Sequence, residues 1–144
     1  MVITTDTSFL FALYGNDSHS AKAAAWVSTA QDTIWISTFN DFELRNALRF
    51  SEFSKRIARG TSIDHLALFE NALALGRLTP NNPNLADILS EANRMSLAHT
   101  LTGGHRGFDI LHVAAAKIIG ATHFLTFDVN QKKLAQHEGL IVPL

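Results

Sequence analysis

The feature that most constrains this fold is an alternation of short apolar runs with longer segments that repeat apolar residues at helical spacing. The runs, rich in β-branched residues, predict strands, and the segments between them predict helices. Helices that separate strands favour a parallel sheet covered on both faces. The predicted fold class is therefore α/β, a three-layer α/β/α sandwich around a mostly parallel sheet of about five strands. The predicted strands are 2–5, 33–36, 77–79, 123–127 and 140–142, and the predicted helices are 8–14, 18 or 20 to 30, from 37 or 38, 61 or 62 to 76, from 85, 108–119 and 130–137.

Length and composition narrow the class of protein. The 144 residues suit one domain, 1–144, and 47% hydrophobic with 17% charged residues excludes a disordered chain. Twelve basic and thirteen acidic residues give a net charge of −1, which excludes a strongly basic nucleic-acid binder. The absence of cysteine excludes disulfides, thiolate catalysis and cysteine-bound metals. Zinc held by histidine is not excluded, although no His-Glu-x-x-His pattern is present.

Targeting signals are also absent from the sequence pattern. Asp6 interrupts the first apolar run, so a secretory signal is not expected. The most apolar stretch, 110–127, contains His112, Lys117 and His123, so it is not expected to span a membrane. We therefore expect a cytoplasmic protein.

Four carboxylates are expected at one edge of the predicted sheet. Ligands of open parallel sheets bind at the carboxyl ends of the strands. Asp6 follows the first strand, Glu43 lies early in the helix after the second, Asp109 begins the helix after a glycine-rich loop, and Asp128 follows the strand 123–127. Converging carboxylates repel one another unless a cation lies between them. An all-oxygen set without cysteine suits Mg²⁺ or Mn²⁺.

Each carboxylate also has a structural interpretation. Asp6 and Asp128 are equally suited to cap the helices that begin after them. Taken alone, Asp109 is equally well explained as a helix-dipole residue, and Glu43 as an exposed acid at a helix start. Four such residues at one edge make the purely structural interpretation much weaker than it is for any one of them.

The sequence resembles the PIN-domain ribonucleases, and in particular the single-domain VapC-like toxins of bacterial toxin–antitoxin pairs. The resemblance runs over the whole chain, with its most specific parts at 106–116 and 124–128. Its landmarks are Val2-Ile3-Thr4-Thr5-Asp6-Thr7-Ser8, Asn40-Asp41-Phe42-Glu43-Leu44, Arg106-Gly107-Phe108-Asp109-Ile110-Leu111-His112-Val113-Ala114-Ala115-Ala116 and Phe124-Leu125-Thr126-Phe127-Asp128.

The resemblance implies a metal-dependent endoribonuclease that hydrolyses RNA phosphodiester bonds. The acids that match the family pattern, Asp6, Glu43, Asp109 and Asp128, would hold one or two Mg²⁺ or Mn²⁺ ions. Asp6 and Asp109 are expected as central ligands, and Glu43 and Asp128 as ligands or water orienters. The resemblance also implies a small cognate antitoxin as partner and a homodimer.

Two pairs of residues are weaker candidates. Ser8 and Thr126 are candidate hydroxyls that hydrogen-bond to the ligands, and a local turn or capping bond is at least as good an explanation for either. Arg45 and Arg49 belong to a basic stretch suited to RNA phosphates, and a merely solvated helix face explains them about equally well.

The remaining aromatic and histidine residues are expected to be structural. His112, one turn after Asp109, can reach the site but is favoured as a hydrogen-bonded structural histidine. The rings of Phe9, Phe11, Phe42, Phe69 and Phe124 are predicted in the core, and Phe39, Phe42, Ala47 and Phe50 on the apolar side of their helix.

Three other functions can be weighed from the sequence alone. A PIN-like scaffold would bind RNA or protein without cleavage. A magnesium-dependent phosphotransferase with Asp6 as nucleophile usually carries a second Asp two residues on, where this chain has Ser8. A phospho-receiver usually has further acids beside the first strand and a Lys after the last, which this chain does not supply.

Overall fold

The computed structural model describes all residues from 1 to 144 and contains a four-stranded parallel sheet. The strands are β1 (Ile3–Thr5), β2 (Ile34–Ile36), β3 (Leu78–Pro80) and β4 (His123–Leu125), in the order β3-β2-β1-β4. The predicted fifth strand is reduced to one parallel bridge between His123 and Ile141. Pro143 lacks a backbone N–H and cannot extend that ladder. The predicted fold class is confirmed, with four strands in place of about five.

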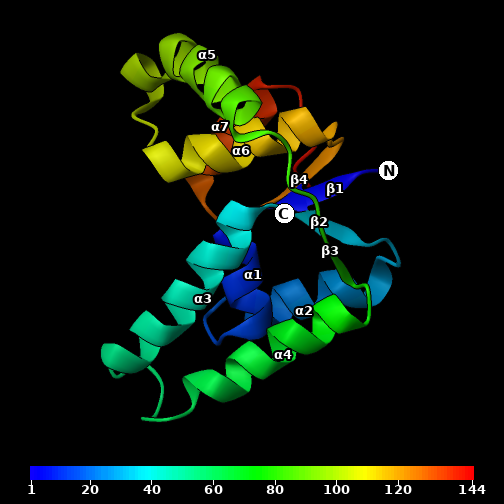
Figure 1. The fold of residues 1–144 in the computed structure, drawn as a ribbon, viewed down its shortest axis with the longest axis vertical. Helices are drawn as coiled ribbons and strands as arrows, with labels where there is room; N and C mark the ends of the chain where they lie inside the picture. Colours follow the sequence, from blue (N-terminus) through cyan, green and yellow to red (C-terminus); the bar gives the residue numbers. More distant parts are fainter.

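Seven helices cover the two faces of the sheet (Figure 1). On one face lie α1 (Thr7–Tyr14), α2 (Ser20–Thr29), α3 (Thr38–Phe53) and α4 (Ser62–Ala74), whose core includes Phe9, Leu44 and Phe69. On the other lie α5 (Leu85–Gly103), α6 (Gly107–Ile119) and α7 (Val129–His137), which pack around Val113 and Phe124. The sheet is therefore buried on both sides, as its continuous apolar strands require.

The apolar side of α3 differs from the prediction. Phe42 is 63% exposed and Phe50 is 56% exposed, so placing them in the core was wrong, whereas the burial of Phe9, Phe69 and Phe124 is confirmed. Leu44 and Leu48 are buried instead, on the same face as Asn40 and Ser51. The helix begins at a capping box in which Asn40 accepts a hydrogen bond from the Ser37 backbone N–H, and packing against α1 and α4 selects the face that is buried.

The loop that precedes α6 is shorter than the sequence pattern indicated. The predicted glycine-rich loop before α6 consists of three residues, because α5 continues through Gly103. Gly104 ends α5 with a left-handed backbone (φ +63°), which a glycine adopts without strain. Arg106 then caps α6 in an extended conformation. This short turn places the first turn of α6 beside the end of β4.

Candidate active site

The four predicted carboxylates lie at the carboxyl-terminal edge of the sheet or on the helices that begin there. Asp6 comes directly after β1 and Asp128 lies three residues after the end of β4. Glu43 is in the second turn of α3 and Asp109 in the first turn of α6. Parallel strands bring these segments to one edge, although they are far apart in the sequence.

Asp6 is the most buried of the four, with 2% of its surface exposed. The Ser8 hydroxyl lies 2.8 Å from both carboxylate oxygens, and the Thr126 hydroxyl donates to Oδ2 at 2.6 Å. Burial raises the pKa of Asp6 to about 6, although hydrogen bonds from Thr126, Phe9 and Ser8 oppose the change. A buried carboxyl that no lysine or arginine neutralises is a group for which a bound cation would supply the missing charge.

The two hydroxyls also join Asp6 to the turn that carries Asp128. Ser8 Oγ accepts a hydrogen bond from the Phe127 backbone N–H at 2.9 Å, and Thr126 Oγ1 accepts one from the Asp128 N–H at 3.0 Å. Ser8 and Thr126, the two candidate hydroxyls, thus both hydrogen-bond to Asp6. The hydroxyls therefore hold the first carboxylate and the β4–α7 turn in one hydrogen-bonded unit.

Glu43 contacts His112, a residue that the sequence indicated could reach the site. The imidazole is 3% exposed, and its Nε2 lies 3.3 Å from Glu43 Oε2 and 3.4 Å from Thr7 Oγ1. Its Nδ1 lies 3.2 Å from the amide nitrogen of Asn40. Burial opposes ionisation of Glu43, but the hydrogen bond and charge of His112 prevail and lower its pKa below the usual value. The favoured interpretation of His112 as a hydrogen-bonded histidine agrees with this geometry, and its partner is an acid of the site.

Asp109 and Asp128 face a single guanidinium that the sequence analysis did not assign to the site. Arg106 Nε donates to Asp109 Oδ2 at 3.0 Å, and Arg106 Nη2 lies 3.8 Å from Asp128 Oδ2. The signal that was available is the spacing of Arg106 and Asp109, which places them three residues apart at a helix start. The contact to Asp128 is tertiary and has no signature in the sequence.

The capping interpretation of two acids is correct and does not compete with a role in the site. Asp6 Oδ1 accepts from the Phe9 N–H at 3.1 Å, and Asp128 Oδ1 accepts from the Gln131 N–H at 2.8 Å. Each cap orients one carboxylate at a helix N-terminus, where the dipole favours negative charge. Helix capping thus fixes the direction in which these two side chains point.

The donor set fits a hard divalent cation in chemical type. Its four carboxylates come from four segments and include no sulfur ligand, as Mg²⁺ and Mn²⁺ prefer. In the present arrangement no three acids or histidines converge into a group that could hold a metal ion. Arg106 pairs with both Asp109 and Asp128, so its guanidinium occupies carboxylate oxygens that a metal would need.

Comparison with known families decides the relationship of the chain. The family model described as the PIN domain matches residues 3–136. The chain belongs to the PIN-domain family. No curated protein matches it significantly by sequence.

Several solved structures share the fold of this PIN domain. VapC20 of Mycobacterium tuberculosis, described as a toxin that cleaves the sarcin–ricin loop, is 16% identical over 96% of both chains with a TM-score of 0.70. VapBC2 of Rickettsia felis, bound to a DNA fragment from its promoter, is 18% identical over 99% of this chain and 97% of the other, with a TM-score of 0.64. FitAcB of Neisseria gonorrhoeae is 18% identical over 98% and 96%, with a TM-score of 0.65. At these identities the likeness concerns the fold.

The basic residues of α3 are not equivalent in this PIN domain. Arg45 pairs with Asp41 and Glu70 and lies 5.2 Å from the centre of the Phe69 ring. Arg49 is exposed and forms no ion pair. A role for either in RNA binding stays a prediction, with Arg45 already neutralised by its own chain.

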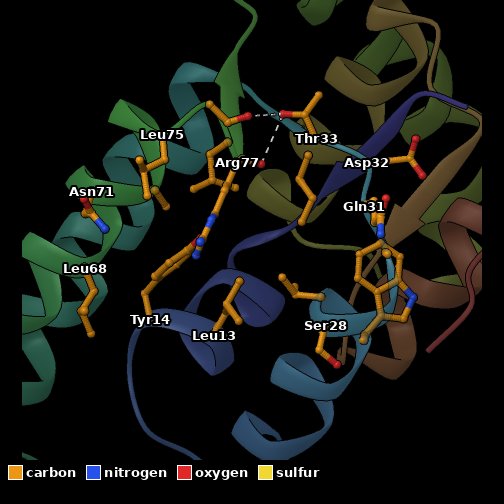
Figure 2. Close-up of a pocket in the computed structure, with 17 residues that line it drawn as sticks. Leu13, Tyr14, Ser28, Gln31, Asp32, Thr33, Leu68, Asn71, Leu75 and Arg77 are labelled. Carbon is orange, nitrogen blue, oxygen red and sulfur yellow. Dashed lines mark hydrogen bonds between the residues drawn. The ribbon is translucent and has the colours of Figure 1, made fainter.

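A large cavity of this PIN domain lies away from the acids. It is a groove of about 730 Å³ between α1, α2 and α4 at the amino-terminal ends of β2 and β3. Figure 2 shows Leu13, Tyr14 and Leu68 lining it beside Arg77. None of the four carboxylates contributes to it.

No helix of the structure is long and apolar enough to cross a membrane.

Proposed function

We propose that this PIN domain is a metal-dependent endoribonuclease and the toxin component of a toxin–antitoxin pair. The observation that carries the proposal is the arrangement of Asp6, Glu43, Asp109 and Asp128 at one edge of the sheet. A structural role alone does not require a 2%-exposed aspartate that accepts two hydroxyl hydrogen bonds at the same edge of the sheet as three further acids.

Asp6, Glu43, Asp109 and Asp128 are the residues that would hold Mg²⁺ or Mn²⁺. When bound, the metal would supply a water of lowered pKa and positive charge beside the scissile phosphate. Asp6 and Asp109 would be the central ligands, because they are the two acids with the least exposed side chains.

The surrounding residues hold these acids in position. Ser8 and Thr126 prevent Asp6 from turning, since together they occupy both of its oxygens. His112 anchors Glu43, and Asn40 fixes the ring of His112 from its other nitrogen. Such orienting partners typically contribute 10- to 100-fold to metal affinity or activity, on the order found for other metal sites.

The proposed toxin role is supported by the relatives and by the surface. VapC20 is described as a toxin, and the fold neighbours include VapBC complexes from two bacteria. Leu97 and Leu101 on α5 and Phe53 on α3 are 86%, 98% and 81% exposed. Exposed apolar side chains of this size suit surfaces that a partner covers. We propose a small antitoxin and a second copy of the chain as the partners.

The direct test is cleavage of single-stranded RNA by the purified protein in Mg²⁺ or Mn²⁺ and in EDTA. Asp6→Asn should abolish metal-dependent cleavage while the folded state persists by circular dichroism. Asp32→Asn is the matched control, because Asp32 is exposed beside the distant groove. Wild-type cleavage by Asp6→Asn, or equal cleavage in EDTA, would contradict the proposal.

The toxin role has a separate test in cells. Induced wild type should arrest growth, whereas Asp6→Asn expressed to the same level should not. Co-expression of a small protein encoded next to the chain should restore growth. Normal growth with well-expressed wild type would instead favour an RNA-processing enzyme over a toxin.

A further inference from the structure

Among the lysines and arginines, only Arg106 forms ion pairs with acids of the site, and its partners are Asp109 and Asp128. Its contact with Asp109 joins the cap residue and the third residue of α6, a local pair that occurs at many helix starts. Its contact with Asp128 reaches a different element, the turn after β4. One guanidinium therefore separates two acids that would otherwise repel each other.

The backbone of Arg106 follows a closely packed turn, whereas its side chain is exposed to solvent. His105, directly before it, is 8% exposed, and a Cβ at Gly103 would lie 2.3 Å from His105 Nε2. The imidazole thus packs into space that only a glycine leaves, and Gly104 adopts the left-handed turn. The side chain of Arg106 is nevertheless 77% exposed. Its backbone is fixed beside the acids, and only solvent-exposed ion pairs hold its guanidinium.

We propose that Arg106 is a phosphate-binding residue that Asp109 and Asp128 hold in the metal-free protein and that a divalent cation releases to the RNA. The inference rests on the proposed nuclease function and adds a residue to it. A divalent cation carries twice the charge of a guanidinium and competes for the same two carboxylates. Exposed ion pairs are weak enough to be replaced.

The release places a suitable group beside the substrate. An arginine presents two parallel N–H donors that match phosphate oxygens. Because the backbone of Arg106 stays at the edge of the site, the released guanidinium remains within one side-chain length of the acids. The same residue thus balances the acids before metal binding and contacts the RNA backbone afterwards.

The first test measures Mn²⁺ affinity by titration calorimetry, without RNA. Arg106→Gln removes the competing charge and should bind Mn²⁺ about three- to tenfold more tightly, the factor that one or two exposed ion pairs represent. Arg106→Lys keeps the charge and should stay near wild type. Arg77→Gln makes the same change at the distant groove and should leave the affinity unchanged. Equal Mn²⁺ affinity in wild type and Arg106→Gln would overturn the exchange.

The second test measures binding of single-stranded DNA, which presents phosphates without being the proposed substrate. In saturating Mn²⁺, Arg106→Gln should weaken binding and lower the slope of log affinity against log salt by about 1. In EDTA, where the acids hold Arg106, the same change should have little effect. An equal loss in both conditions would mean a general electrostatic role and would overturn the proposal.

The outcomes separate this proposal from the proposed function. If the wild type cleaves RNA with Mn²⁺ and Arg106→Gln has the same Mn²⁺ affinity as the wild type, the exchange is overturned and the nuclease function stands. Absence of Mn²⁺ binding from both wild type and Arg106→Gln would overturn both. Binding of Mn²⁺ by Arg106→Gln alone would support the exchange in its strongest form.

Discussion

Two arginines of this PIN domain each join two acids, and their surroundings differ. Arg94 on α5 pairs with Glu91 on the same helix, at 2.7 Å, and with Glu138 just after α7. Glu138 is only 7% exposed and also lies 2.7 Å from His99 Nε2. Arg106 is 77% exposed, and its partners, Asp109 and Asp128, are 13% and 32% exposed.

The same ion-pair chemistry is therefore found in two different surroundings, one buried and one exposed. The Arg94 network ties α5 to α7 and holds a carboxylate that would be costly to leave unpaired. The Arg106 network lies at the carboxyl ends of the strands and is open to solvent. We therefore expect the first to contribute to stability and the second to contribute to the site.

The largest expected effect is on RNA cleavage, which should be lost when an acid of the Arg106 network is changed and kept when an acid of the Arg94 network is changed. Asp109→Asn should reduce metal-dependent RNA cleavage by at least about 100-fold, because changes to residues that merely orient metal ligands already cost 10- to 100-fold. Glu138→Gln should cleave RNA at close to the wild-type rate. Initial rates at saturating Mn²⁺ are the measurement, and equal losses in both variants would remove the distinction.

Substitutions of the two arginines should lower the free energy of unfolding by different amounts. Arg94→Gln leaves the buried carboxylate of Glu138 with His99 alone and should lower the free energy of unfolding by about 1–3 kcal/mol. Arg106→Gln should lower it by no more than about 1 kcal/mol. Urea unfolding without metal gives both values. A greater loss in Arg106→Gln would show that its pairs are structural.

The pH dependence of stability should follow the Arg94 network. Burial opposes ionisation of Glu138, yet the bonds from Arg94 and His99 prevail and lower its pKa below the usual 4.5. A lowered pKa contributes stability that is present above the unfolded value and lost as the pH falls through the folded value. The stability difference between wild type and Arg94→Gln should therefore be full at neutral pH and shrink below pH 4.5. Unfolding curves across this range would test it; a constant difference contradicts it.

The smallest effect concerns a third arginine between two acids, Arg45. Neutralising Arg45 and Arg49 together should weaken RNA binding and reduce its salt dependence. Arg49→Gln alone should account for most of the change, because Asp41 and Glu70 already balance the charge of Arg45. Salt titrations of RNA affinity distinguish the two, and an unchanged slope in the double variant would exclude α3 from the interface.

The sequence predicted the strand and helix order because each element carries its own periodic pattern. It predicted the edge at which Asp6 and Asp128 lie because parallel strands direct their ends alike. It misplaced Phe42 because both faces of α3 carry apolar residues, and only packing against α1 and α4 selects the face of Leu44 and Leu48. Helix propensity cannot predict which face is buried, because it contains no information about the elements that pack against the helix.

The overall charge also acquires a more specific meaning in the fold. Setting the four candidate ligands aside leaves 9 of the 13 acids against 12 bases, a balance of +3. The net charge of −1 is thus the sum of an acidic edge and a mildly basic remainder. Such a division suits a protein that binds both a metal and a phosphate backbone.

By itself the sequence determined the fold class and the family and placed four candidate carboxylates at one edge of the sheet, because these follow from local patterns and from their order along the chain. Only the tertiary structure decided which groups meet them. Thr126 reaches Asp6 across 120 residues of chain, His112 reaches Glu43 across 69, and Arg106 reaches Asp128 from another element. Such contacts depend on how the helices pack over the sheet, and packing is a property of the whole chain that no local spacing encodes.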